Sequence, residues 1–178
     1  MADKIWNDPG FAPKRQYRWL LRFGTAASDV PEYICKSVDK PSFNISEQEH
    51  TFLNHKYWYP GRVEWQDVKV TIVDPLEFDA ANRLQQIIAE SGYLIPDDMD
   101  QALAPDKLTT ISKAKAVEQV GLVVIQQIDA NGKAVTEFEL HNTWIKEVNY
   151  GSLSYEEDGL VEIELTLKYD WARQNHVG

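Results

Sequence analysis

The residues of this sequence that could bind a metal ion do not have the spacing that a metal site needs. The four histidines are His50, His55, His141 and His176. No two of them have the i, i+4 spacing of a helix or the i, i+2 spacing of a strand that brings two ligands together. The acidic run Asp97, Asp98 and Asp100 resembles the start of a calcium-binding loop, but the required glycine and the late bidentate glutamate are absent. We therefore predict no metal site.

The side chains that could support catalysis are equally isolated. Cys35 is the single cysteine, and it lies between Ile34 and Lys36 in an alternating segment, with no helix N-terminus nearby to activate its thiol. Glu162 and Glu164 would share one face of a strand roughly 7 Å apart, a spacing that glycosidases use but that any polar strand face also produces. The sequence has no glycine-rich phosphate loop and no Gly-x-Ser-x-Gly motif. We predict no enzyme and no cofactor.

The composition is that of one globular domain with an excess of acidic residues. The chain has 178 residues, of which 43% are hydrophobic and 26% charged, and its formal net charge is −10. Residues 1–89 carry 11 basic and 12 acidic side chains, whereas residues 90–178 carry 7 and 16. Tight binding to nucleic acid depends on cations that neutralise phosphates, so this charge balance disfavours it.

The same composition gives an expectation about location. A lone cysteine excludes an intrachain disulfide and is compatible with a reducing cytoplasm. No apolar run approaches the roughly 20 residues of a membrane span, and residues 1–10 lack the apolar core of a signal peptide. We expect a soluble protein with no membrane anchor and no obvious export.

Alternation of apolar and polar residues predicts a chain made mainly of strands. The clearest segments are residues 17–23, 63–73 and 160–171, in which alternate side chains are apolar. The other predicted strands are residues 32–38, 42–45, 113–128, 134–141, 144–148 and 152–155. Gly121 is predicted to form a bulge, and Asn131-Gly132 to form a hairpin turn because both residues tolerate positive φ.

A single helix is predicted, at about residues 75–91. Asp74 is a suitable N-cap, Pro75 suits the first helical position and Gly92 is a stop signal. One helix among many strands predicts a mainly β fold, an antiparallel β-sandwich or open barrel with the helix packed on it. The whole chain, residues 1–178, would form one domain. Such a fold must pair or protect the edges of its sheets.

Three segments fit no regular element: an N-terminal arm (1–14), a projecting segment (46–62) and a long loop (93–112). Residues 46–62 mix aromatic and polar side chains without a period, which is typical of contact surfaces. The charge is also segmental, because residues 1–22 carry five basic and two acidic side chains while residues 137–164 carry one and eight. Unlike patches of this kind suit head-to-tail association of identical subunits.

The order of these segments resembles that of a known family, the tail tube proteins of contractile-tailed bacteriophages (the T4-like tube family). The likeness covers about residues 14–172. It is carried by the opening strand 17–23, the strand and proline turn 33–41, the motifs 52–56 and 59–62, the strand 65–74 that leads into the helix, the segments 140–145 and 151–155, and the final strand 163–171 with its Asp-Trp ending.

The resemblance implies a structural virion protein. Subunits of this family form sixfold rings that stack helically into a hollow tube inside a sheath, and sheets of neighbouring subunits join into one large β-barrel. The expected partners are therefore other copies of this chain, the tail sheath protein, and the baseplate and tail terminator proteins. The tape measure protein and then double-stranded DNA would pass through the lumen without specific binding. The expected location is the virion tail tube, assembled in the host cytoplasm.

The projecting segment, the basic arm and two glutamates are the candidate functional residues. The ring-to-ring contact is predicted to involve Phe52, Asn54, His55, Lys56, Tyr57, Trp58, Tyr59 and Arg62. The basic arm, with Lys14, Arg15 and Arg18, is predicted to contact an acidic flank of a neighbour. Glu137 and Glu139 are candidates for a lumen wall that repels phosphates, on the polar faces of residues 32–45 and 120–140.

Two alternatives remain open at this point. The tube fold also occurs in baseplate tube proteins and in the tubes of secretion systems, so the chain could be one of these instead of a major phage tube protein. A different class is a monomeric β-sandwich module that binds sugar or peptide with Trp58 and Trp65. That module would be a monomer with an aromatic cleft, whereas a tube protein would assemble.

Overall fold

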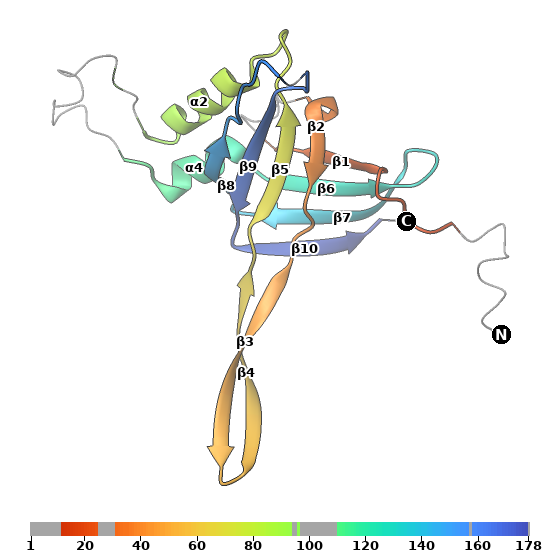
Figure 1. Cartoon of the computed structure of the whole chain (residues 1–178). Coiled ribbons are helices and arrows are strands. Elements are labelled where there is room, and N and C mark those ends of the chain that lie inside the picture. Colours follow the sequence, from red (N-terminus) through yellow and green to blue (C-terminus); the bar gives the residue numbers. More distant parts are fainter. Residues whose placement is uncertain (1–11, 25–30, 94–95, 97–109, 157, 178) are drawn as a thin grey trace.

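Two four-stranded antiparallel sheets form the body of the protein, and a two-stranded ribbon extends from it (Figure 1). The computed structural model describes residues 12–24, 31–93, 96, 110–156 and 158–177. Sheet A has the strand order β1-β6-β7-β10, and sheet B has the order β2-β5-β9-β8. The predicted fold class, a mainly β antiparallel sandwich, is confirmed.

Sheet A consists of β1 (Trp19–Arg22), β6 (Val123–Ile128), β7 (Ala134–His141) and β10 (Trp171–His176). Sheet B consists of β2 (Cys35–Val38), β5 (Val68–Val73), β9 (Glu162–Lys168) and β8 (Trp144–Asn149), and the short 3-10 helix η2 (Glu32–Ile34) leads into β2. The ribbon consists of β3 (Phe43–Phe52) and β4 (His55–Trp65). The predicted strands at 17–23, 32–38 and 63–73 are therefore shorter or divided.

The core lies between the inner faces of the two sheets, whose strands run across each other in Figure 1. Alternate residues of each central strand are buried because successive side chains of a strand point to opposite faces. The buried apolar residues of the strands are Leu21, Val68, Val70, Ile72, Val123, Ile125, Leu140, Ile163, Leu165 and Leu167. Each contributes roughly 1.5–3 kcal/mol of burial free energy, so this cluster holds the sheets together.

Helix α2 (Ala80–Glu90) begins later than the predicted residue 75. Its N-cap is Asp79, whose carboxylate accepts a hydrogen bond from the Asn82 amide at 2.8 Å. Asp74 instead accepts from the Ala80 amide at 3.0 Å, so it stabilises the turn before the helix without capping the first predicted residue. The predicted stop is correct, because Ser91 is the C-cap and Gly92 has a φ of 115°.

A second helix, α4 (Lys113–Val120), corrects the prediction that the chain returns to strand at residue 113 and has only one helix. Ser112 caps it by accepting from the Lys115 amide at 3.3 Å, and the predicted bulge residue Gly121 is its C-cap, with a φ of 69°. Ala116 and Val120 are buried four residues apart, which is helical spacing. Both helices lie at the same end of the molecule (Figure 1).

The predicted strand 160–171 is divided at Tyr169 and Asp170 into two strands that belong to different sheets. Asp170 fixes this corner: its amide donates to the His141 carbonyl at 3.0 Å, and its carboxylate accepts from Asn142 at 2.8 Å and from Lys113 at 2.6 Å. The hydrogen bonds from the side chains of Lys113 and Asn142 lower the pKa of the Asp170 carboxyl, and the one from Lys113 has the larger effect. Residues 152–155, another predicted strand, form none.

Candidate assembly surfaces

The sheets leave their outer strands unpaired within the described part of the chain. β1 and β10 are the edges of sheet A, and β2 and β8 are the edges of sheet B. An edge strand exposes a row of backbone amides and carbonyls that can pair with another chain. A subunit with such edges at both ends of a sheet can join a copy of itself head to tail.

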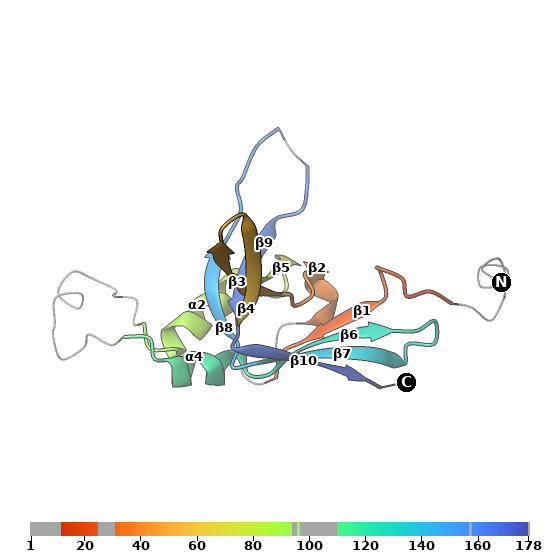
Figure 2. The ribbon, with the colours of Figure 1, turned by 90° about the horizontal axis from the view of Figure 1, so that it is seen from below.

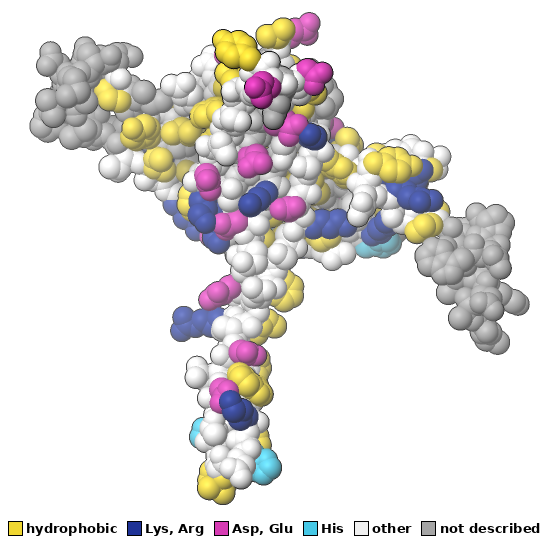
Figure 3. Space-filling view, in the orientation of Figure 1, with side chains coloured by type: hydrophobic (Ala, Val, Ile, Leu, Met, Phe, Trp, Pro, Cys, Tyr) yellow, Lys and Arg dark blue, Asp and Glu magenta, His cyan; other side chains and the backbone are white. Residues whose placement is uncertain are grey.

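The β3–β4 ribbon is the most exposed element of the molecule. It projects from the body with hydrophobic, charged and histidine side chains along its length (Figures 1 and 3). Its exposed large hydrophobic residues are Phe43, Ile45, Phe52, Leu53, Tyr57, Trp58, Tyr59 and Val63. Burying this much apolar surface requires another molecule, because the ribbon packs against the body of its own subunit at its root and not along its projecting length.

The predicted contact residues lie on both faces of this ribbon. The register pairs His50 with Tyr57 and Gln48 with Tyr59, so these tyrosines share a face, whereas Trp58 pairs with Glu49 on the other face. Lys56 lies beside Glu49 with its ammonium nitrogen 3.0 Å from a carboxylate oxygen. Phe52 pairs with His55 at the tip, next to Asn54. The ribbon therefore offers two different aromatic surfaces.

A bulge divides the ribbon into two segments. Gly61 and Arg62 of β4 stand opposite Ser46 of β3, whose hydroxyl accepts a hydrogen bond from the Arg62 amide at 2.8 Å. A Cβ at position 61 would lie 2.3 Å from that hydroxyl oxygen, so a larger residue would displace the hydroxyl from its hydrogen bond with Arg62. Bulges increase local twist, and this one turns the distal half of the ribbon relative to its root.

Leu53 is a candidate contact residue that the sequence interpretation missed. It occupies the tip of the ribbon with a φ of 52° and is 81% exposed. A leucine in the left-handed region is unfavourable by roughly 1–2 kcal/mol compared with a right-handed conformation. The sequence signal was an apolar residue directly before Asn54, in a turn where a polar residue or glycine is usual.

The root of the ribbon is fixed by aromatic packing. The Trp65 ring lies between Phe43, at a centroid distance of 5.2 Å, and Tyr169, at 5.9 Å. The Gln66 amide donates to the Ser42 carbonyl at 2.8 Å. Burial raises the pKa of the Tyr169 hydroxyl to about 12, so it stays protonated. This packing orients the ribbon relative to sheet B.

An ionic cluster stands beside the aromatic root. The Asp67 carboxylate accepts hydrogen bonds from Lys146 of β8 at 2.6 Å and from Lys168 of β9 at 2.7 Å. These two hydrogen bonds lower the pKa of Asp67. Because Asp67 lies in the short link between β4 and β5, two residues after the end of β4, the cluster connects the end of the ribbon to two further strands of sheet B.

The basic arm is described only from residue 12, so its first 11 residues lie outside the described part of the chain. Lys14 donates a hydrogen bond to the buried hydroxyl of Thr136, on β7 of its own subunit. The Arg18 guanidinium lies over the Tyr17 ring at 5.4 Å, and Arg15 is exposed. Contact of these three residues with a neighbour stays a prediction.

Glu137 and Glu139 lie on the face of sheet A that points away from the core. The register places them opposite Asn175 and Arg173 of β10, and Asn175 donates to Glu139 at 2.9 Å. This face therefore carries arginines as well as glutamates and is not strongly acidic. The other predicted wall segment, residues 32–45, falls in sheet B and the ribbon, so the structure does not bring it onto this face.

The remaining chemical candidates stay apart. Burial, and secondarily the charge of Glu32, raises the pKa of the Cys35 thiol to about 11, so it is protonated. Glu162 of β9 forms an ion pair with Lys36 of β2. The described residues contain no group of three or more histidine, cysteine or acidic side chains placed to hold a metal ion. The acidic run at 97–100 lies outside them. No described helix has the length and apolarity needed to span a membrane.

Comparisons with known proteins identify the fold. No family model and no curated protein matches the sequence. A chain in the cryo-EM structure of the anti-feeding prophage baseplate is 15% identical, with a TM-score of 0.62, covering 93% of this chain and 97% of that one. A chain in the structure of the anti-feeding prophage tube-terminating cap is 14% identical, with a TM-score of 0.63 and 93% coverage of both.

A third likeness spans the two chains almost completely. A chain in the extended sheath-tube complex of an extracellular contractile injection system is 13% identical, with a TM-score of 0.55 and 99% coverage of both chains. At these identities the likeness establishes a shared fold, which is found in structures of contractile injection systems.

Proposed function

We propose that this chain is the structural subunit of the inner tube of a contractile tail. Sixfold rings of it stack into a hollow tube that a sheath surrounds. The observation that carries the proposal is the shared fold over nearly the whole chain combined with unpaired edges on both sides of both sheets. A monomer would leave those edges open, whereas a ring pairs each edge with the next subunit.

Closure uses β1 of one subunit and β10 of the next. Sheet A then continues from subunit to subunit into one large barrel, and its outward face, with Glu137 and Glu139, lines the bore. Because arginines share this face, repulsion of phosphate would come from the net charge of the assembled tube and not from a purely acidic wall. The tape measure protein and double-stranded DNA would pass along it.

The β3–β4 ribbon makes the ring-to-ring contact. Its exposed aromatic residues are of the type that carries most of the binding energy in interfaces. The contact residues are Phe52, Asn54, His55, Lys56, Tyr57, Trp58, Tyr59 and Arg62, together with Leu53 at the tip. Sheath, baseplate and terminator proteins would contact the outside and the two ends of the tube.

The order of the sequence motifs supports a phage tail tube, located in the virion and assembled in the host cytoplasm. A second candidate is the tube of an injection system, because the anti-feeding prophage and the extracellular injection system provide the solved structures reported above. Both candidates assign the same subunit contacts.

A monomeric binding module is less well supported. It requires Trp58 and Trp65 to line one cleft, but Trp58 lies on the distal ribbon while Trp65 packs at its root. Size-exclusion chromatography and negative-stain electron microscopy of the purified protein test the proposal. We expect rings or tubes with a central bore. A protein that stays monomeric at every concentration and salt condition would contradict it.

A further inference from the structure

Two further surfaces of this subunit are not explained by strand pairing or by the ribbon, although one of them borders β1, the edge strand that pairs with β10 of the next subunit in the proposed tube. One is a groove where the edges of the two sheets approach each other, between β1 and β2. The other is the loop between β8 and β9, described at residues 150–156 and 158–161 and called here the β8–β9 loop. From these surfaces we infer a second contact between neighbouring subunits, which rests on the proposed tube function.

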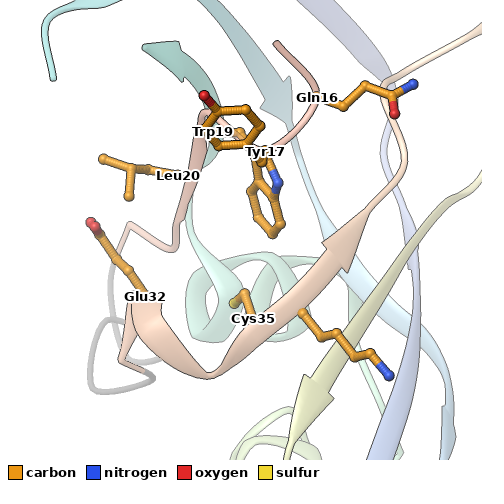
Figure 4. Close-up of a pocket in the computed structure, with 7 residues that line it drawn as sticks. Gln16, Tyr17, Trp19, Leu20, Glu32 and Cys35 are labelled. Atoms are coloured by element: carbon orange, nitrogen blue, oxygen red, sulfur yellow. The ribbon is translucent and has the colours of Figure 1, made fainter. Parts of the chain in front are cut away.

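The groove has a volume of about 750 Å³. Figure 4 shows Tyr17, Trp19 and Leu20 on one side and Glu32 and Cys35 on the other. Trp19, Leu20 and Cys35 are half-buried, and Tyr17 is 73% exposed. The groove is therefore an open hollow with an aromatic and aliphatic lining.

The surroundings of the groove are basic. Residues 12–22 contain four basic side chains and no acidic one. The two closest to the groove lining in sequence, Arg15 and Arg18, flank Gln16 and Tyr17. The lining glutamate, Glu32, is neutralised by Arg22, whose guanidinium nitrogen lies 2.7 Å from the carboxylate. An occupant with apolar side chains and negative charge would fit this surface.

The β8–β9 loop has that chemistry. Residues 150–161 contain three acidic side chains and no basic one. Tyr155 is fully exposed, Leu153 is 87% exposed and Leu160 is 72% exposed. The loop protrudes from sheet B on the side away from sheet A (Figure 2). Large apolar side chains at the end of a protruding acidic loop are typical of an element that inserts into a partner.

We infer that the β8–β9 loop of one subunit inserts into the β1–β2 groove of its neighbour. Leu153 and Tyr155 would occupy the hollow, while Glu156 and Asp158 would face Arg15 and Arg18. The charge complementarity selects a second copy of this chain as the occupant, because one molecule carries both halves of the contact on separate surfaces. Such a contact is heterologous, as a head-to-tail ring requires.

Charge reversal on each side provides the test. In the groove variant, Arg15→Glu plus Arg18→Glu, an acidic groove would meet the unaltered acidic loop. In the loop variant, Glu156→Lys plus Asp158→Lys, a basic loop would meet the unaltered basic groove. All four side chains are exposed or half-buried, so both variants should fold, which circular dichroism verifies. We expect each variant alone to need a roughly tenfold or higher concentration to assemble, the equivalent of about 1.4 kcal/mol per contact.

An equimolar mixture of the two variants is the decisive sample. Groove and loop are complementary again when the two variants alternate, so rings should return in the mixture and contain both chains in equal amounts. Tyr155→Ser, a substitution of a fully exposed side chain, should weaken ring formation with no effect on folding. Analytical ultracentrifugation and electron microscopy measure all samples beside the unaltered protein.

Several outcomes would overturn the inference. One is ring formation by either variant alone at unaltered concentration, and another is a mixture that does not assemble. A loop variant that forms normal rings but fails only to stack them, or to acquire a sheath, would assign the loop to those partners instead. If the unaltered protein forms rings in the same experiment, such results reject this contact and leave the proposed function intact. An unaltered protein that never assembles rejects both.

Discussion

At the scale of single residues, the tip of the ribbon combines strain with exposure. Leu53 has a left-handed backbone and contacts little of its own subunit. Strained positions persist where the surroundings or a function require them, and an exposed tip provides no packing that would enforce this one. The leucine is therefore better explained by a contact with another molecule than by folding.

Replacing Leu53 separates these two roles. Leu53→Asn should make local opening of the ribbon tip less favourable by up to about 1 kcal/mol, because asparagine tolerates the left-handed region. The same change should weaken tube assembly by removing an apolar anchor. Amide hydrogen exchange near Phe52 and His55 measures the first effect, and the concentration for half-maximal assembly measures the second. Faster amide exchange at the ribbon tip of the variant, or half-maximal assembly at the same concentration as the unaltered protein, would contradict this role.

The Asp67 carboxylate links the end of the ribbon to sheet B through ion pairs with two lysines. Hydrogen bonds from Lys146 and Lys168 lower its pKa in the folded state. A lowered folded-state pKa means that this carboxylate stabilises the fold above its unfolded pKa of about 3.9. That stability disappears as the pH falls through the folded-state value.

Asp67→Asn should therefore lower the free energy of unfolding at pH 7 by about 1 kcal/mol, since the two lysines are about half exposed and solvent screens them. The difference between the two proteins should be constant above about pH 5 and shrink below about pH 4. Urea denaturation at several pH values measures it. Glu64→Gln, with the same loss of charge on the exposed ribbon, should change stability at pH 7 by less than about 0.5 kcal/mol. A pH-independent difference would refute the role of the Asp67 charge.

At the scale of elements, the assembly role proposed for the ribbon is separable from folding. Trp58→Ala plus Tyr59→Ala removes one aromatic residue from each face of the ribbon, and these side chains are 55% and 57% exposed. The subunit should keep its melting temperature because neither side chain belongs to the core. It should not polymerise, because each aromatic surface loses a large side chain of the type that dominates binding energy in interfaces.

Electron microscopy and thermal unfolding measure the two effects of this double substitution. Gln48→Ala changes the cross-strand partner of Tyr59 without removing an aromatic ring, so it serves as the matched control and should form normal tubes. Unchanged tubes in the double variant would show that the ribbon does not make the ring-to-ring contact.

The elements also show what a sequence pattern can reveal. Period-two alternation identified β5, β7 and β9, because one face of each strand is buried and the other is not. Alternation failed in the ribbon, since both of its faces are exposed and neither requires apolar residues. It also continued through Asp170, so the pattern contained no sign that the chain passes from sheet B to sheet A there.

Helix α4 was missed for a related reason. Its eight residues make just over two turns, and only Ala116 and Val120 are buried, so the apolar period is too short to distinguish it from the strand that follows. The candidate contact residues could be located because aromatic side chains among polar ones are unusual without a core to fill. Their division between two faces follows from the pairing of β3 with β4, which the sequence pattern did not indicate.

At the scale of the whole molecule, two electrostatic effects oppose each other during assembly. Each subunit carries a net charge of −10, so bringing many copies together is unfavourable at long range. In the proposed tube, the basic residues of the arm would provide short-range attraction to an acidic neighbour. Salt screens both, with a Debye length near 8 Å at physiological ionic strength and about 3 Å at 1 M.

A variant of the arm separates the two effects. We expect high salt to weaken assembly of the unaltered protein, because attraction across the subunit contact dominates over repulsion between whole subunits. Arg15→Gln plus Arg18→Gln removes that attraction and leaves the long-range repulsion, so added salt should now favour assembly. Light scattering at ionic strengths from about 0.05 to 1 M measures both trends. Equal salt dependence in the two proteins would mean that these arginines make no contact between subunits. The interface between subunits would then depend on strand pairing and apolar burial alone.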